Sequence, residues 1–184
     1  QVGNEINHGM VWPEGSIAHP DSLAQLIQAG IAAVKKVNPE TIIMLHVALG
    51  GQYEETRFFF DELQKRAVDY DVMGLSYYPN WHGTLDDLRD NMLDLIRVYN
   101  KDIIVVEYSA RKEAVNRIVF GLPGGRGKGT CIWEPLSTWE KIFDEQGNAN
   151  EYLPLYDRFH QQYIEPKHTS SEKRNRKTFS GALY

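Results

Sequence analysis

The feature of this sequence that most constrains its fold is a regular alternation of short strand-like runs and amphipathic helices. Runs rich in β-branched and apolar residues recur about every 30 residues, at 2–4, 41–48, 71–78, 102–108 and 129–133. Each is followed by a segment of helical periodicity, at 22–37, 53–69, 85–99, 112–120 and 152–163. This order predicts parallel strands joined by right-handed helical crossovers, which is the α/β class.

Local signals support the individual helices. Asp21 is placed to cap the first helix and Pro39 follows its end, while Thr84 is placed to cap the third. In the second helix the periodicity predicts that Phe58 and Phe59 are buried, together with Leu63 and Val68.

The strands favour a barrel over a nucleotide-binding sheet. Residues 42–45 and 103–106 are continuous apolar runs, as expected for strands covered on both faces. No glycine-rich phosphate loop joins a strand to a helix, so a doubly wound dinucleotide-binding fold is disfavoured. We therefore expect a (β/α)8 TIM barrel, although 184 residues is short for one, since about 200 is the usual minimum.

Composition excludes several classes of partner. The formal net charge of −5 gives no positive field to hold nucleic acid or an anionic membrane, and no apolar run reaches the roughly 20 residues of a membrane span. Cys131 is the single cysteine, so no intrachain disulfide can form. A neutral or small partner fits better.

Polar and aromatic residues gather where the strands end, which is where barrel enzymes build their active sites. Glu5 ends the first run and Glu107 lies near the end of the fourth. Two carboxylates at strand ends of one barrel are typical of glycosidases, and a structural ion pair is the alternative. The other candidates at strand ends are Asn4, His46, Tyr77, Tyr78, Trp81, His82 and Trp133.

Three motifs resemble glycoside hydrolase family 53, the endo-β-1,4-galactanases that cut arabinogalactan. They are residues 2–13 (VGNEINHGMVWP), 71–85 (DVMGLSYYPNWHGTL) and 133–135 (WEP). The resemblance covers residues 1–164 and implies the C-terminal part of a (β/α)8 barrel, with strands four to eight present and the first three missing. It also implies Glu5 as acid/base, Glu107 as nucleophile, retention of configuration, and a secreted or periplasmic protein.

The remaining site residues have both functional and structural interpretations. Asn4 is placed to bind a sugar 2-hydroxyl, and Tyr77 or Tyr78 to donate a hydrogen bond to Glu107. Trp81 and Trp133 offer faces for stacking on a pyranose, whereas Trp12 and Trp139 are as readily core residues. His46 and His82 are candidate partners of hydroxyls or carboxylates, or structural histidines.

No cofactor or metal is expected. Asp144, Asn148 and Asn150 offer oxygen ligands for calcium, which family members can bind in loops, but the segment reads more simply as a turn. The polar, locally basic tail 165–184 is expected to be disordered.

Three functions stay open. The chain is an endo-β-1,4-galactanase, a retaining enzyme acting on another β-glycan, or an inactive half-barrel. Because an open parallel sheet exposes its edges, self-association or a complementing N-terminal fragment is also expected.

Overall fold

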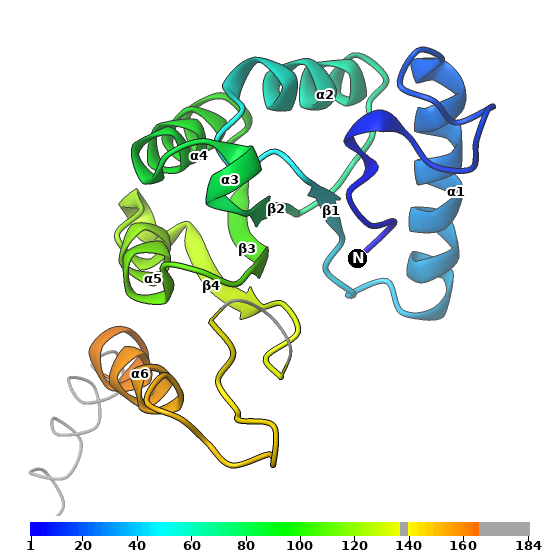
Figure 1. Cartoon of the computed structure of the whole chain (residues 1–184). Helices are drawn as coiled ribbons and strands as arrows, with labels where there is room; N and C mark the ends of the chain where they lie inside the picture. Colours follow the sequence, from blue (N-terminus) through cyan, green and yellow to red (C-terminus); the bar gives the residue numbers. More distant parts are fainter. Residues whose placement is uncertain (137–139, 166–184) are drawn as a thin grey trace, which may run out of the picture. The chain divides into compact units, whose positions relative to one another are not determined.

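A computed structural model describes residues 1–136 and 140–165 of the chain. These fall into two compact units, one ending at Glu134 and one beginning at Pro135. The first unit is built on a parallel sheet of order β1-β2-β3-β4 (Figure 1). Its strands are β1 (Met44–Val47), β2 (Val72–Tyr77), β3 (Asp102–Tyr108) and β4 (Gly127–Ile132). The α/β class and the parallel sheet are confirmed.

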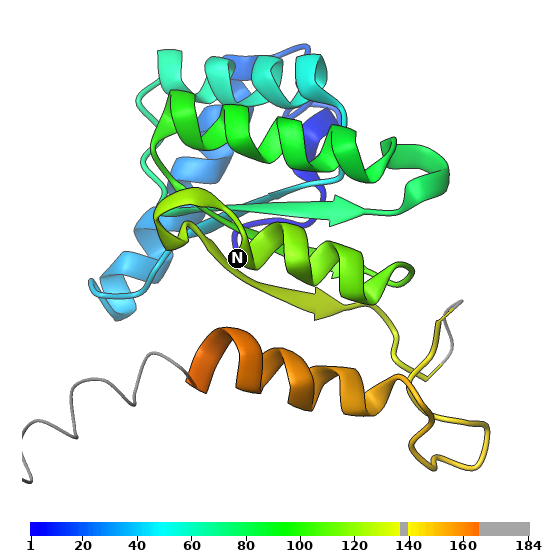
Figure 2. The ribbon, with the colours of Figure 1, turned by 90° about the vertical axis from the view of Figure 1, so that its left-hand side faces the viewer.

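Helices connect the strands and lie along the outer side of the curved sheet, and the strands all point the same way (Figures 1 and 2). The long ones are α1 (Pro20–Val37), α2 (Tyr53–Lys65), α4 (Leu85–Tyr99) and α5 (Lys112–Phe120). Short turns add η1 (Ile6–His8), α3 (Pro79–His82) and η2 (Pro123–Gly125). In the second unit, α6 (Leu153–Phe159) continues into a π-helical turn, η3 (His160–Ile164).

The first predicted strand is wrong. Residues 2–4 lie beside β1, where the Val2 N–H donates to the Met44 carbonyl at 3.0 Å, but they form no strand. The reason is local, because Gly3 (φ 77°) and Glu5 (φ 48°) have left-handed backbone that ends any extended run.

The predicted helix caps have mixed outcomes. Thr84 caps α4 as expected, accepting from the Asp87 N–H while the Asp87 carboxylate accepts from the Thr84 N–H. Asp21 does not cap α1. The helix starts earlier, at Pro20, because proline is pre-organised for the first helical position, and His19 precedes it.

The apolar core lies between the sheet and its helices. Alternate strand residues such as Leu75 and Val105 are fully buried in this core. The helices contribute Leu23, Ile27, Phe59, Phe60, Leu63, Leu88, Met92 and Leu95. Phe58 was predicted to be buried and is 54% exposed, so only the second and third of the three consecutive phenylalanines enter the core.

Among the residues that the structure describes, no helix is both long and apolar enough to cross a membrane. Cys131 is exposed on β4.

Candidate active site

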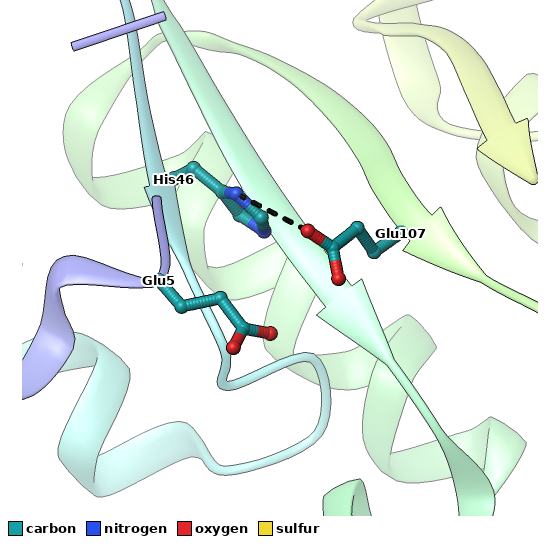
Figure 3. A group of neighbouring side chains, drawn as sticks. All are labelled: Glu5, His46 and Glu107. Atoms are coloured by element: carbon teal, nitrogen blue, oxygen red, sulfur yellow. Dashed lines mark ion pairs between the residues drawn. The ribbon is translucent and has the colours of Figure 1, made fainter. Parts of the chain in front are cut away.

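Three ionisable side chains converge on the face of the sheet opposite the helices (Figure 3). Glu5 comes from the N-terminal segment, His46 from β1 and Glu107 from β3. One polar atom of each lies within 4.8 Å of the other two. The two carboxylates that the sequence singled out, 102 positions apart in numbering, therefore face each other across a short gap.

Glu5 is held in an uncommon backbone conformation. It immediately precedes η1 with φ 48° and ψ 49°, in the left-handed region that a non-glycine residue seldom adopts. Its side chain makes no capping hydrogen bond to η1. Instead, Oε1 of Glu5 hydrogen-bonds to Ser76 Oγ on β2 at 2.6 Å. Strain of this kind, of order 1–3 kcal/mol, is found where a side chain must point to a site.

Glu107 reaches the same face because β3 contains a bulge. Leu75 pairs with Val105, but the next residue of β2, Ser76, pairs with Glu107, so Val106 is extra. An extra residue re-aims the side chains that follow it. Glu107 consequently shares a face with Ser76 instead of following Val105 into the helix-covered core.

Opposing effects act on the pKa of Glu107, and the net shift is upward. Burial raises the pKa of its carboxyl group, and Glu5, when it is ionised, raises it further. Two hydrogen bonds oppose this effect: the Tyr78 hydroxyl donates to Oε2 at 3.3 Å, and the Asn4 side chain also donates to the carboxylate. Burial also raises the pKa of the Tyr78 phenol, which stays protonated as a donor.

His46 joins the two carboxylates. It is 1% exposed and pairs in the sheet with Gly74, next to Ser76 on the same face. Its Nε2 lies 2.8 Å from Ser76 Oγ, and its Nδ1 lies 3.1 Å from Asn4 Oδ1 and 4.0 Å from Glu107 Oε1. Burial lowers the pKa of the imidazole to about 4, against the opposing effect of Glu5, so the ring is neutral at neutral pH.

Of the two candidate tyrosines, only Tyr78 belongs to the site. Tyr77 is fully buried on the helix side, where its hydroxyl donates to the Gly83 carbonyl at 3.1 Å. Successive strand residues point to opposite faces, so the assignment of Tyr77 to substrate is wrong.

His82 has a structural position. It is 8% exposed, its Nδ1 accepts from the Tyr78 N–H at 3.1 Å, and its ring packs on the Tyr78 ring. Burial lowers the pKa of its imidazole. His82 therefore packs against the Tyr78 ring and the backbone of Ser76, which gives it a supporting position.

The tryptophans keep exposed faces. Trp81 is 60% exposed and stands edge-on to the Tyr78 ring, whose centroid is 6.3 Å away. Trp133 is 44% exposed and its backbone N–H donates to the Tyr108 carbonyl at 2.8 Å. Trp12, at 63% exposure, is not a core residue, and Trp139 lies outside the described residues.

Ser76 is the site residue that sequence reasoning missed. It is fully buried and contacts both Glu5 and His46. The signal for it was its place in the run 71–78, two positions after Gly74 and thus on the face of a strand opposite to Leu75 and Tyr77.

Neither candidate group of metal ligands needs a metal to explain it. The spacing of Glu5, His46 and Glu107 would admit an ion, but these groups already form hydrogen bonds with Ser76, Asn4 and Tyr78. The carboxylate oxygens of Asp144 stabilise a turn, where they accept from the backbone N–H groups of Gln146 and Asn148 and from the Asn148 side chain.

A parallel sheet with outer helices, and two facing carboxylates near the carboxyl ends of its strands, one on β3 and one in the N-terminal segment beside β1, are typical of the class of barrel glycosidases. Comparison with known proteins gives the family. The model of glycosyl hydrolase family 53 matches residues 1–117, and the chain belongs to this family.

Individual relatives agree with this assignment. The chain is 40% identical over 200 residues to an uncharacterized protein in the bgaB 5' region of Niallia circulans, covering 85% of this chain and 55% of that protein. It is 35% identical over 114 residues to arabinogalactan endo-beta-1,4-galactanase A of Aspergillus niger, covering 58% of this chain and 33% of that enzyme.

Solved structures show the same fold. A fungal β-1,4-galactanase superposes with a TM-score of 0.75 at 25% identity, covering 85% of this chain and 60% of that one. The family 53 catalytic domain of Ignisphaera aggregans gives 0.70 at 29% identity, covering 84% and 57%. The four-stranded parallel sheet is that of part of a (β/α)8 barrel, as predicted, and the chain spans a third to three fifths of the length of these four relatives.

Proposed function

We propose that this chain carries the catalytic centre of a retaining endo-β-1,4-galactanase acting on galactan or type I arabinogalactan. The observation that carries the proposal is the facing pair Glu5 and Glu107 in unequal surroundings. Tyr78 and Asn4 donate hydrogen bonds to Glu107, which stabilise a carboxylate, whereas Glu5 contacts a hydroxyl.

In this mechanism Glu107 attacks the anomeric carbon while Glu5 protonates the leaving glycosidic oxygen. Glu5, now ionised, then takes a proton from the water that hydrolyses the glycosyl–Glu107 bond. The separation of the two groups is compatible with retention and excludes most of the inverting range. Oxygen atoms within 4.8 Å put the carboxyl carbons no more than about 7 Å apart, since each C–O bond adds about 1.2 Å. Retaining enzymes need about 5–5.5 Å and inverting ones about 6.5–9.5 Å.

The rest of the site suits a neutral sugar polymer. Trp81 and Trp133 present exposed faces of the kind that stack on pyranose rings, and we assign them to substrate binding with Asn4 and Tyr78. His46 is 1% exposed and contacts Ser76 and Asn4, so we do not assign it to direct substrate contact. The net charge of −5 argues against a polyanionic partner. Because a cell does not take up a galactan polymer intact, we propose that the protein is secreted or periplasmic.

The test is hydrolysis measured as release of reducing ends, with lupin galactan, mannan and β-glucan compared at equal mass. We expect activity on galactan, with the β-anomer as the first product seen by NMR. Glu5→Gln should lower the rate by about 10²–10⁴-fold. With an aryl galactoside, whose leaving group needs no proton, added azide should restore turnover only in this variant, measured as phenol release. Glu107→Gln should abolish both turnover and trapping by a 2-fluorogalactoside.

Other outcomes would separate the alternatives. Preference for mannan or glucan would change the assigned substrate but leave the mechanism as proposed. An α-anomeric first product would exclude retention. A chain that binds no glycan and hydrolyses none would favour the inactive half-barrel. Self-association or a complementing fragment stays a prediction, for which light scattering after gel filtration gives the mass. β4 has one strand neighbour among the described residues, so its outer edge is where pairing is expected.

A further inference from the structure

A row of hydrogen-bonding atoms connects Glu5 to His46 through Ser76. Oε1 of Glu5 lies 2.6 Å from Ser76 Oγ, and Ser76 Oγ lies 2.8 Å from His46 Nε2. Two hydrogen bonds need two hydrogens, and the serine hydroxyl supplies only one. The second must sit on Glu5 or on His46 Nε2.

The orientation of Asn4 decides between these two positions. The Asn4 amide nitrogen donates to Glu107, so its Oδ1 faces His46. Gln1 supports this orientation, because its Nε2 lies 2.9 Å from the Gly3 carbonyl and 3.0 Å from Asn4 Oδ1 and donates one hydrogen to each. The same Nε2 lies 3.2 Å from His46 Nδ1, but with both of its hydrogens given to these two oxygens it has none left for that nitrogen. An amide oxygen is only an acceptor, so the His46 Nδ1 at 3.1 Å must carry a hydrogen.

A neutral imidazole has one N–H, and in His46 it is therefore on Nδ1. Nε2 is then an acceptor, and Ser76 donates to it. With its hydrogen spent on His46, Ser76 can only accept from Glu5, and Glu5 must be a protonated acid. Burial keeps His46 from becoming the doubly protonated alternative.

We propose that Ser76 and His46 are positioning residues that hold the acid proton on Glu5, and that the Asn4 side chain sets the direction of this hydrogen-bond row. The Asn4 amide thus sets the protonation of both carboxyl groups. Its N–H donates to Glu107 as a carboxylate, and its oxygen, acting through His46 and Ser76, requires Glu5 to be protonated. The catalytic role of this hydrogen-bond row rests on the proposed glycosidase function, whereas the arrangement of its hydrogen bonds does not.

The row also favours recovery of the acid in the second half-reaction. When Glu5 gives its proton to the leaving oxygen, the C–O bond to the leaving group breaks and the bond from C1 to Glu107 forms. The single hydroxyl hydrogen of Ser76 can then bond either to ionised Glu5 or to His46 Nε2, so one of these acceptors is left unpaired in a buried site. When Glu5 takes a proton from the attacking water, both hydrogen bonds return.

The direct test is the tautomer of His46, measured by ¹⁵N NMR on the labelled full chain at neutral pH. The His46 signals among the six histidines are identified by their absence in His46→Gln. We expect the Nδ1–H form. An Nε2–H form or an imidazolium at neutral pH would overturn the proposal. This readout needs no substrate, so it decides the inference even if galactan is not hydrolysed and the proposed function fails.

The second test is the pH profile of kcat/KM. Ser76→Ala removes an acceptor that stabilises protonated Glu5, so the alkaline limb should move down by about one pH unit, the tenfold effect of one ordinary hydrogen bond. Ser76→Thr keeps the hydroxyl and should restore the limb. The matched control is Ser109→Ala, since Ser109 is equally buried and its hydroxyl makes no hydrogen bond within the described part of the chain.

Other ionisable groups face this row and set the background of the profile. They are Glu107 on β3, Tyr78 and His82 after β2, and Glu134 after β4. All of these groups are retained in Ser76→Ala and in the control. A shift of the alkaline limb of kcat/KM that occurs only in Ser76→Ala therefore reports the loss of the hydrogen bond between Ser76 and Glu5. A limb at the same pH in the wild type and Ser76→Ala would overturn the proposal.

Discussion

Ser76 lies directly opposite Glu107 in the sheet, although the pair before it joins Leu75 to Val105. The extra residue, Val106, brings Glu107 onto the face that carries His46 and Ser76. Without this bulge, strict alternation would send Glu107 after Ile103 and Val105 toward the helices, where a carboxylate would meet apolar side chains. The site thus depends on an irregularity of the strand that carries its nucleophile.

The first prediction concerns the stability cost of that carboxylate. The pKa of Glu107 is raised by burial and by Glu5, so folding holds its proton more tightly than the unfolded chain does. The resulting penalty is absent at acid pH, where Glu107 is protonated in both states, and present at neutral pH. Glu107→Gln should therefore raise Tm at pH 7, with a gain that fades toward pH 4, in calorimetric scans.

Glu40→Gln is the control, because Glu40 is exposed and should change Tm little. If Glu107→Gln lowered Tm at pH 7, the surroundings of Glu107 would have to stabilise its charge more than burial opposes it.

The second prediction concerns the acid limb of activity. The nucleophile must be ionised, and the Tyr78 hydroxyl stabilises that form by its hydrogen bond to Oε2. Tyr78→Phe removes the bond, raises the pKa of Glu107 further, and should move the acid limb of kcat/KM upward by up to about one pH unit. Tyr53→Phe, on the exposed part of α2, should leave the limb in place. A downward shift in Tyr78→Phe would contradict the assignment.

The sequence was sufficient for the order of elements and for the pairing of Glu5 with Glu107. Helical periodicity predicted four of the helices closely, and the capping box at Thr84 was readable because it depends on residues three apart. These features are local, so neighbouring residues determine them.

The rest depended on backbone geometry that the pattern does not encode. Tyr77 and Tyr78 are adjacent, and a one-residue change of register exchanges their faces, so the sequence left both open. The left-handed conformation of Glu5 and the bulge at Val106 arise where tertiary contacts override the local preference. Ser76 was missed for the same reason, since its role appears only when β1, β2 and the N-terminal segment are brought together.

The third prediction concerns the close approach of two loops below Tyr78. A Cβ added at Gly51 would lie 2.1 Å from the His82 carbonyl oxygen, a backbone atom that cannot move without shifting α3. Gly51→Ala should lower the free energy of unfolding by about 1–3 kcal/mol and disturb the Tyr78–Glu107 hydrogen bond. Urea denaturation and the pH profile measure the two effects.

Gly125→Ala provides the comparison for Gly51→Ala. A Cβ there meets nothing within 4 Å, and its cost is limited to the positive φ of 66°, about 1–2 kcal/mol, with no effect on the pH profile. Equal pH profiles in both variants would show that the loop contact does not support Tyr78.

The last prediction uses the three consecutive phenylalanines of α2 as a test of the core. Phe59 is fully buried, with its ring edge-on to Phe60 at 5.2 Å, whereas Phe58 is 54% exposed. Phe59→Ala leaves a cavity between α2 and the sheet and should cost about 3–5 kcal/mol, while Phe58→Ala should cost less than about 1 kcal/mol. Guanidinium denaturation at a constant m-value measures both. Equal losses would mean that Phe58 is covered in solution, which would place an undescribed contact on the outer face of α2.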